Sequence, residues 1–372
     1  MLDQSFDTDV FVIGGGPAGI AAAIAARQRG LRAMVADVLC PPIDKACGEG
    51  LMPDSVIELR RLGVSLAGHA QGSFRGIRFM GPQSSVQADF PSGLGVGVRR
   101  TTLHLALAER ALQCGVELLW QTRVDGISGN WVNFGGRKIR SRWIVGADGH
   151  NSLVRSWAGL NRAREFERRI ALRRHFKLPK MPTHVEIHWG DDRQAYLTPV
   201  DHNEVCVALI SKRKLDNFDY ELRRIPSLTE TLAGADPTSK VRGALSLSNR
   251  LRNVSRGNVV LVGDASGSVD AITGEGLALS FRQALALAEA FTADDVSLYQ
   301  AAHRRIQKLP QFMRRAMLLM DKSATLRRRT LATFDVEPEL FQRMLSVHVG
   351  EIPLTSFGAG ALARFGWQMV SA

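Results

Sequence analysis

The fold is decided near the N-terminus by the stretch Asp9-Val10-Phe11-Val12-Ile13-Gly14-Gly15-Gly16-Pro17-Ala18-Gly19. An apolar strand enters a glycine-rich turn, and a helix over residues 20–29 is expected to follow. Gly14 permits the sharp turn, Gly16 lets the backbone approach a phosphate, and Gly19 lets the helix pack closely on the sheet. Unpaired N–H groups and the positive helix dipole attract the same phosphate. The stretch therefore predicts a site for a dinucleotide pyrophosphate.

Three further segments bear on this site. A second strand over residues 32–36 ends in Asp37, at about the spacing expected of an acid that binds a ribose hydroxyl. Two later segments repeat the pattern of an apolar strand followed by glycine and aspartate, namely Trp143-Ile144-Val145-Gly146-Ala147-Asp148-Gly149 and Val259-Val260-Leu261-Val262-Gly263-Asp264-Ala265. Taken singly, each of these two is equally compatible with a turn that caps a helix. A helix N-terminus at Gly276 offers a place for a second electronegative group.

Together these motifs resemble the FAD-dependent superfamily that contains the group A (aromatic-hydroxylase-type) monooxygenases, the geranylgeranyl reductases and the flavin-dependent halogenases. The resemblance covers about residues 8–290. It implies a non-covalent FAD and NAD(P)H as reductant, without a separate NAD(P)H domain. The cofactor-binding residues that it implies are Gly14, Gly16, Pro17, Ala18, Gly19, Asp37, Arg100, Val124, Asp148, Gly149, Arg155, Gly263, Asp264, Gly274, Glu275 and Gly276.

The expected fold class is α/β. A Rossmann-like FAD-binding domain of the glutathione-reductase/PHBH type is interleaved with a mostly antiparallel β-sheet substrate domain, and a helical C-terminal region follows. Strand patterns dominate residues 168–248, which motivates the second domain. The predicted boundaries are 1–73, 98–165 and 249–292 for the FAD-binding domain, 74–97 and 166–248 for the substrate domain, and 293–372 for the helical region.

The segment Lys45-Ala46-Cys47-Gly48-Glu49-Gly50 resembles the Lys/Arg-x-Cys-Gly-x-Gly segment of geranylgeranyl reductases. This resemblance places Cys47 near flavin and substrate, where a thiol could donate a proton. A nearby Lys45 would lower the pKa of the thiol, and Glu49 and Glu275 are candidate acids or bases. The alternatives are that Cys47 only fills space beside two glycines, and that Glu49 or Glu275 only caps a helix or anchors Arg100.

No metal site is predicted, because the histidines show no ligand-like grouping. His184 and His188 fall on one face of an expected strand, where surface positions are favoured over a metal site.

The stretch Tyr196-Leu197-Thr198-Pro199 corresponds to an aromatic Tyr-x-Trp-x-Phe-Pro segment of geranylgeranyl reductases, and makes Tyr196 and Pro199 the candidate substrate-binding residues. It lacks the Trp and Phe of that segment. The absence of any lysine between Lys45 and Lys138 argues against halogenation. Hydroxylation of an aromatic or polyketide-like molecule is slightly favoured, as the most frequent chemistry of the superfamily. The alternative is reduction of a C=C bond in a lipophilic substrate, with Cys47 near the reacting carbon.

The net charge of +12 comes mostly from arginine, and part of it gathers in residues 304–329. A solvated helical face is favoured there over contact with anionic lipid or an acidic partner, although peripheral membrane contact stays open. No nucleic-acid motif occurs, so no nucleic-acid partner is expected. The polar, acidic first residues, the lack of a long apolar run and the four scattered cysteines point to a cytoplasmic protein. The oligomeric state is not indicated.

Overall fold

A computed structural model describes residues 5–81, 85–161 and 163–357. It shows the expected α/β architecture. The first sheet has the strand order β18-β19-β11-β1-β2-β8, and the strands from β19 to β8 are parallel. Their bounds are β1 (Thr8–Ile13), β2 (Ala33–Ala36), β8 (Glu117–Leu119), β11 (Arg137–Gly146), β18 (Ser255–Arg256) and β19 (Val259–Leu261). Val10, Phe11 and Val12 are fully buried, as expected of a parallel strand covered on both faces.

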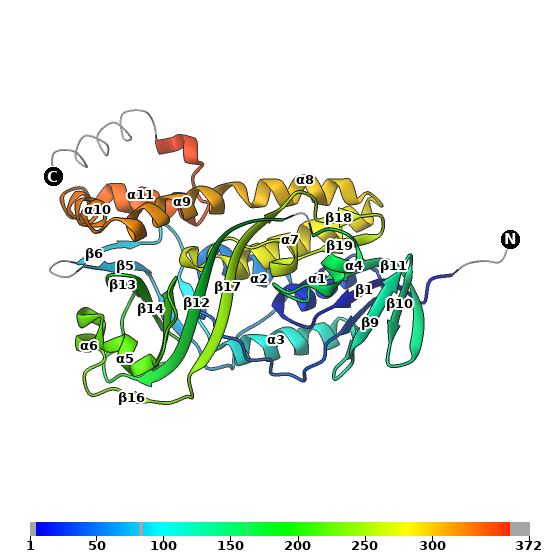
Figure 1. Ribbon diagram of the computed structural model, residues 1–372, viewed down its shortest axis with the longest axis horizontal. Coiled ribbons are helices and arrows are strands. Elements are labelled where there is room, and N and C mark those ends of the chain that lie inside the picture. The colour runs from blue at the N-terminus through cyan, green and yellow to red at the C-terminus, as the bar shows by residue number, and fades with distance from the viewer. Residues whose placement is uncertain (1–4, 82–84, 162, 358–372) are drawn as a thin grey trace.

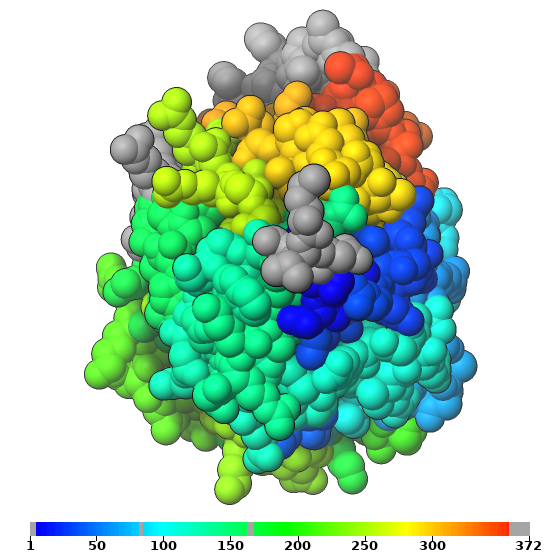
Figure 2. All heavy atoms as spheres, turned by 90° about the vertical axis from the view of Figure 1, so that its right-hand side faces the viewer, coloured from blue at the N-terminus to red at the C-terminus, as the bar shows by residue number. Residues whose placement is uncertain are grey.

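Helices from distant parts of the chain cover this sheet. Helix α1 packs against α3 and α7, and an antiparallel pair, β9 and β10, extends β11. The bounds are α1 (Pro17–Gln28), α3 (Arg100–Gln113), α4 (Leu153–Trp157), α7 (Gly276–Thr292), β9 (Val124–Ser128) and β10 (Trp131–Phe134). Figure 2 shows this end of the molecule, where blue, cyan-green and yellow segments lie side by side. The nucleotide-type half is therefore assembled from segments that are remote in sequence.

The second sheet has the order β16-β12-β15-β14-β13-β5-β6, with β17 also paired to β12. All its pairs are antiparallel except β13 with β5. Its strands are β5 (Gly76–Met80), β6 (Ser85–Asp89), β12 (Ala163–Lys177), β13 (Val185–Trp189), β14 (Arg193–Pro199), β15 (Glu204–Ser211), β16 (Asp236–Pro237) and β17 (Arg242–Leu251). The long strands β12 and β17 run side by side between the two halves of the molecule (Figure 1).

Smaller elements lie between the strands of the two sheets. A three-stranded sheet has the order β3-β7-β4. The remaining connecting elements are β3 (Gly50–Leu51), α2 (Pro53–Arg61), β4 (Gly72–Phe74), β7 (Gly95–Gly97), α5 (Phe218–Arg223), α6 (Pro226–Thr231) and the 3₁₀ turns η1 (Gly263–Ser266) and η2 (Ala271–Thr273).

The C-terminal elements form a layer above both sheets, seen in yellow to red along the top of Figure 1. They are α8 (Val296–Ile306), α9 (Lys308–Lys322), α10 (Ala324–Val336), α11 (Pro338–His348) and the 3₁₀ turn η3 (Leu354–Phe357). The predicted helical region extends to residue 372, and residues 358–372 lie outside the described part of the chain. The Phe341 ring stacks on Phe79 of β5 and on Phe334, with centroids 4.8 Å apart in each case. Aromatic packing therefore joins α10 and α11 to the second sheet.

The expectation of surface positions for His184 and His188 was wrong. Both side chains are fully buried. His184 Nε2 lies 2.9 Å from Asp89, and His188 Nε2 lies 3.2 Å from Glu186. A carboxylate partner explains how these polar rings are tolerated in the interior. Among the residues described, no helix combines the length and apolarity needed to cross a bilayer.

Candidate cofactor and active site

A cavity of about 700 Å³ lies where the first sheet, the second sheet and helices α9 and α11 meet. It receives residues from most of the segments singled out in the sequence. The predicted residues that line it are Gly14, Gly16, Pro17, Ala18, Asp37, Lys45, Cys47, Glu49, Arg100, Val124, Asp148, Gly149, Tyr196, Asp264, Gly274 and Gly276. Gly19, Arg155, Pro199, Gly263 and Glu275 do not line it.

The glycine turn between β1 and α1 combines close packing with an open surface. A Cβ at Gly14 would lie 2.4 Å from the Ala147 carbonyl oxygen, and one at Gly19 would lie 1.9 Å from the Gly14 oxygen. Gly19 is therefore a packing residue. A Cβ at Gly16 would have no described heavy atom within 4 Å, so its backbone faces the cavity at the N-terminus of α1. This is the geometry that a pyrophosphate requires.

Asp37 and Asp148 present carboxylates at two strand ends. Asp37 accepts hydrogen bonds from the backbone N–H groups of Gly15 (2.6 Å) and Leu39 (2.8 Å), which tie it to the glycine turn. Oδ2 of Asp148 accepts from the N–H of Leu153 at 2.7 Å. Its Oδ1 is buried and has no hydrogen-bond partner among the described residues. Such an acceptor needs a donor, and a ligand hydroxyl would satisfy it.

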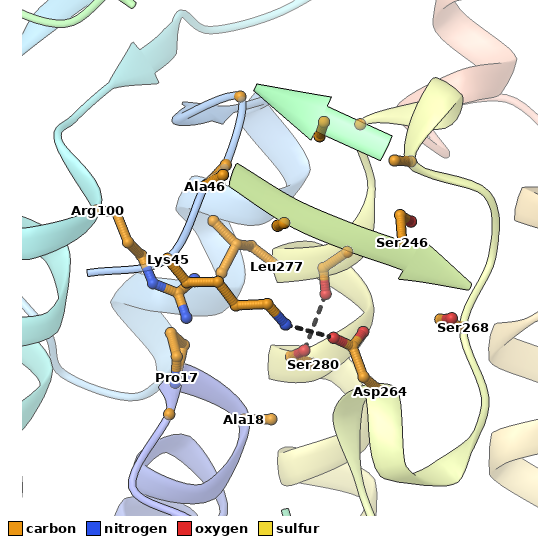
Figure 3. Close-up of a pocket in the computed structure, with 18 of the residues that line it drawn as sticks. Pro17, Ala18, Lys45, Ala46, Arg100, Ser246, Asp264, Ser268, Leu277 and Ser280 are labelled. Atoms are coloured by element: carbon orange, nitrogen blue, oxygen red, sulfur yellow. Dashed lines mark hydrogen bonds and ion pairs between the residues drawn. The ribbon is translucent and has the colours of Figure 1, made fainter. Parts of the chain in front are cut away.

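Asp264 faces the cavity from η1, and its charge is held by two partners. Lys45 Nζ lies 3.2 Å from its carboxylate, as Figure 3 shows, and His150 Nδ1 lies 2.8 Å from it. Burial opposes ionisation, but the hydrogen bond from His150 and the charge of Lys45 outweigh it and keep the pKa of Asp264 well below its ordinary value. Asp264 is therefore an ionised acceptor. Lys45 directs its ammonium to this carboxylate.

Arg155, Gly263 and Glu275 lie next to the cavity without lining it. The Arg155 guanidinium donates to the carbonyl oxygens of His150 (2.7 Å) and Ala265 (3.3 Å), and so joins two of the loops. Gly263 has φ of +58°, and a Cβ there would lie 2.6 Å from the Ala18 Cβ. The contact of these three residues with the cofactor therefore stays a prediction.

The Glu275 side chain turns away from the cavity toward Asp54 of α2. It is 2 % exposed, and its Oε2 has no hydrogen-bond partner among the described residues. Burial and the nearby Asp54 raise the pKa of Glu275 to about 8, against the opposing charge of Arg282. Glu275 is therefore largely protonated at neutral pH.

The chain matches a family model described as an FAD binding domain over residues 7–294. The chain belongs to this family. The open glycines, the unsatisfied Asp148 oxygen and the ionised Asp264 fit FAD as the resident cofactor, and the flavoprotein is an oxidoreductase. FAD would supply hydride chemistry when bound.

Two curated relatives of the flavoprotein are named as reductases. It is 26% identical over 325 residues to menaquinone reductase of Mycolicibacterium smegmatis, covering 79% of this chain and 78% of that protein. It is 26% identical over 324 residues to digeranylgeranylglycerophospholipid reductase of Methanosarcina acetivorans, covering 78% and 77%. A solved flavoprotein/dehydrogenase from Cytophaga hutchinsonii has the same fold, with a TM-score of 0.79, 18% identity and 94% coverage of both chains.

The predicted catalytic residues Cys47 and Glu49 share the cavity wall with the cofactor residues. The Cys47 thiol is half-buried and accepts the Glu49 backbone N–H at 3.4 Å. Glu49 has a left-handed backbone, with φ of +59°, and its side chain is fully buried. Its Oε2 lies 2.7 Å from His175 Nε2, and its Oε1 accepts the Arg100 N–H at 3.0 Å. The expected anchoring between Glu49 and Arg100 is thus made through the backbone N–H of Arg100.

Arg173 and His175 of β12 belong to the site although the sequence did not indicate them. They alternate on one face of the strand and meet Glu49, with Arg173 Nε 3.6 Å from its Oε1. The strand is rich in charged residues along its whole length, so the i, i+2 spacing of Arg173 and His175 did not single them out. The ligand atoms of Glu49, His175 and Cys206 also lie within 4.8 Å of one another, which is a grouping the sequence did not predict. The Arg173 charge beside Glu49 weakens this cluster as a cation site.

The inner end of the cavity is apolar. Its lining includes Phe74, Phe79, Ile187, Ile210, Met317 and Phe341. Tyr196 also lines the cavity, and its hydroxyl is occupied because it donates to the Ile272 carbonyl oxygen at 2.7 Å. Pro199 lies at the end of β14, where its carbonyl packs against Gly72 and Gly97, and this packing keeps it out of the cavity. Of the two predicted substrate-binding residues, only Tyr196 lines the cavity.

Proposed function

We propose that this flavoprotein reduces C=C bonds in the isoprenoid chain of a lipophilic substrate, with NAD(P)H as the electron donor. The observation that carries the proposal is the continuity of one cavity, from the glycine cradle past Cys47 to an apolar end lined by Phe79 and Met317. A hydrocarbon chain gains free energy when it leaves water for such a surface, at about 25 cal/mol per Å². An aromatic hydroxylation substrate would need polar partners for its ring substituents.

The relatives support this order of preference. The two curated relatives described above are named menaquinone reductase and digeranylgeranylglycerophospholipid reductase. Hydroxylation was slightly favoured on sequence alone, because it is the most frequent chemistry of the superfamily. The apolar cavity end and the named relatives now favour the reduction. Peripheral contact with a membrane is part of the proposal, since such substrates reside in lipid.

Reduction of a C=C bond adds one hydride and one proton. In our proposal Cys47 donates the proton, because this half-buried thiol lines the same cavity as the cradle and the apolar end. Tyr196 and its neighbours hold the chain and exclude water. Lys45 and Asp264 orient the polar part of the cofactor.

The test is anaerobic turnover of the FAD-loaded protein with NADH or NADPH and a menaquinone or a geranylgeranyl lipid. We expect a product that has gained two hydrogens, detected by mass spectrometry. Cys47→Ala should lower the rate by about 10²- to 10⁴-fold. Cys114→Ala is the matched control, because Cys114 is half-buried at the end of α3 and does not line the cavity. A product that gains oxygen and forms only in air would overturn the proposal in favour of hydroxylation.

A further inference from the structure

We propose that His175 and Glu49 form a proton relay that connects a second, solvent-facing cavity to the active-site cavity. The proposal rests on the proposed function, because it concerns the proton that the reduction consumes.

The second cavity lies on the other side of the Glu49 side chain. It has a volume of about 240 Å³, and Asp44, Arg99, Arg173, His175, Ser239 and Lys240 are among the residues that line it. Lys240 is exposed and Ser239 is partly exposed, so solvent reaches this cavity. Glu49 and Arg173 line both cavities. Two buried side chains therefore form the partition between solvent and the active site.

A chain of hydrogen bonds leads from Ser239 through His175 to Glu49. His175 Nδ1 lies 2.9 Å from Ser239 Oγ and 3.2 Å from Arg173 Nη1, and His175 Nε2 lies 2.7 Å from Glu49 Oε2. An arginine only donates, so Nδ1 is the acceptor nitrogen of the ring. Nε2 then carries the proton and donates it to the Glu49 carboxylate. The tautomer follows from these partners.

Charged groups of both signs surround the His175–Glu49 pair. On the loop before β3, Asp44 pairs with Arg173 and with Arg242 of β17. The other titratable or charged groups that face the pair are Cys47, Arg99, Arg100, Glu204, Cys206 and Lys240. Arg99 is paired with Glu204, and burial raises the pKa of the Cys206 thiol, which stays neutral. Arg173 is thus the cation that faces the Glu49 carboxylate, with its Nε 3.6 Å from Oε1.

The relay takes one proton from solvent for each proton that it delivers to the active-site cavity. A solvent proton is taken up at His175 Nδ1, directly or through the Ser239 hydroxyl, and the Nε2 proton passes to Glu49. Glu49 releases a proton into the active-site cavity, where it restores the Cys47 thiol after Cys47 has protonated the substrate carbon. One proton enters and one leaves, which leaves the ring protonated at Nδ1. The ring returns to the Nε2–H form when it turns so that Nε2 takes a proton from the second cavity and Nδ1 gives its proton up there. His175 acts through Glu49, so it is a positioning and relay residue.

The test compares two substitutions of His175 in the holoenzyme. His175→Gln keeps a donor toward Glu49 but cannot carry a proton, and His175→Ala leaves room for added imidazole next to the second cavity. We expect each to slow substrate reduction by about 10- to 100-fold and to leave reduction by NADH unchanged, because hydride transfer from NADH consumes no proton. Imidazole should restore His175→Ala, and the restored rate should depend on pH.

The control is His184→Gln, because His184 forms a buried pair with Asp89 and lines neither cavity. It should behave as the wild type. In the apoprotein, long-range ¹H–¹⁵N spectra should show the His175 proton on Nε2. A proton on Nδ1, or an unchanged rate in His175→Gln, would overturn the relay.

The relay and the proposed function can fail separately. If the wild-type holoenzyme reduces no prenylated acceptor, the proposed function fails. Reoxidation of the NADH-reduced holoenzyme by O₂, which also takes up one proton per two electrons, then tests the relay. In that measurement, slowing in His175→Ala with recovery by imidazole supports it, and no slowing refutes it.

Discussion

At the scale of single residues, the glycines of the cavity fall into two physical groups. Gly14 and Gly19 are required by neighbouring backbone, since a Cβ at either would lie within 2.4 Å of a carbonyl oxygen. Gly16 and Gly276 line the cavity, and a Cβ at either would meet no described heavy atom within 4 Å. Gly274 also lines the cavity, but its φ of +68° makes glycine necessary for the backbone as well. The first group serves folding and the second serves the ligand. Substitution should separate the two roles.

Gly16→Ala should leave the apoprotein within about 1 kcal/mol of wild-type stability, because the new methyl group meets only open space. It should weaken FAD binding about 10-fold or more, a loss of about 1.4 kcal/mol. Gly19→Ala should destabilise the apoprotein by about 1–3 kcal/mol, through overpacking against the Gly14 oxygen. Urea unfolding and a flavin fluorescence titration measure the two effects. Equal destabilisation of the apoprotein by both variants would contradict this division.

At the scale of elements, helices α2 and α7 meet at a buried cluster of charges beneath the cavity. Arg282 of α7 pairs with Asp54 of α2, and Glu275 stands at the start of α7. Burial raises the pKa of Asp54 as well, although Arg282 opposes the rise. The junction therefore holds more carboxyl groups than its single arginine can neutralise, and a proton on Glu275 relieves the excess.

The stability of the folded protein should fall with rising pH because of Glu275. Its pKa is about 8 in the folded state and near 4.5 when unfolded, so the folded state binds the proton more tightly. The resulting stabilisation is complete below about pH 4.5 and is lost as the pH rises through about 8. Glu275→Gln, which is always neutral, should be more stable than the wild type above pH 8 by about 2–4 kcal/mol.

Urea unfolding across this pH range measures the difference between the two proteins. Glu117→Gln, at an exposed position of β8, controls for the loss of one carboxyl group. Parallel pH profiles for Glu275→Gln and the wild type would show that Glu275 is ionised in the folded protein.

At the scale of the whole molecule, the cofactor cradle is made by segments that only the complete fold brings together. Asp37, Arg100, Asp148 and Asp264 come from four separate parts of the chain and line one cavity. A ligand that contacts all four residues can bind only the folded chain and not the unfolded chain. FAD should therefore stabilise the protein by mass action.

Removal of FAD should lower the midpoint of thermal unfolding, and added FAD should restore it in a concentration-dependent manner. At 100 times the dissociation constant the stabilisation should be about 2.7 kcal/mol. Differential scanning calorimetry over a series of FAD concentrations measures it. FMN, which lacks the adenylate half, is the control, because it cannot engage the cradle at the glycine turn. A midpoint that is independent of FAD would refute the cradle.

Much of the cofactor half could be predicted because its signals are local. The turn at Gly14 and Gly16, and the acids at Asp148 and Asp264, each follow an apolar strand within a few residues, and the carboxyl ends of parallel strands meet at one edge of a sheet. The partners of Glu49 could not be predicted, since His175 lies 126 positions further along the chain. An alternating strand shows which side chains share a face and leaves open what that face meets.

The sequence by itself determined the α/β class, the FAD cradle and the candidate thiol, because strand periodicity, glycine spacing and residue type can be recognised within short stretches of neighbouring residues. Only the tertiary structure decided that Glu275 and Pro199 do not line the cavity, and that Glu49 and Arg173 separate it from a second cavity lined by His175. Their contacts depend on how the second sheet packs against the first. Burial and charge pairing where the two sheets meet exist only in the folded chain.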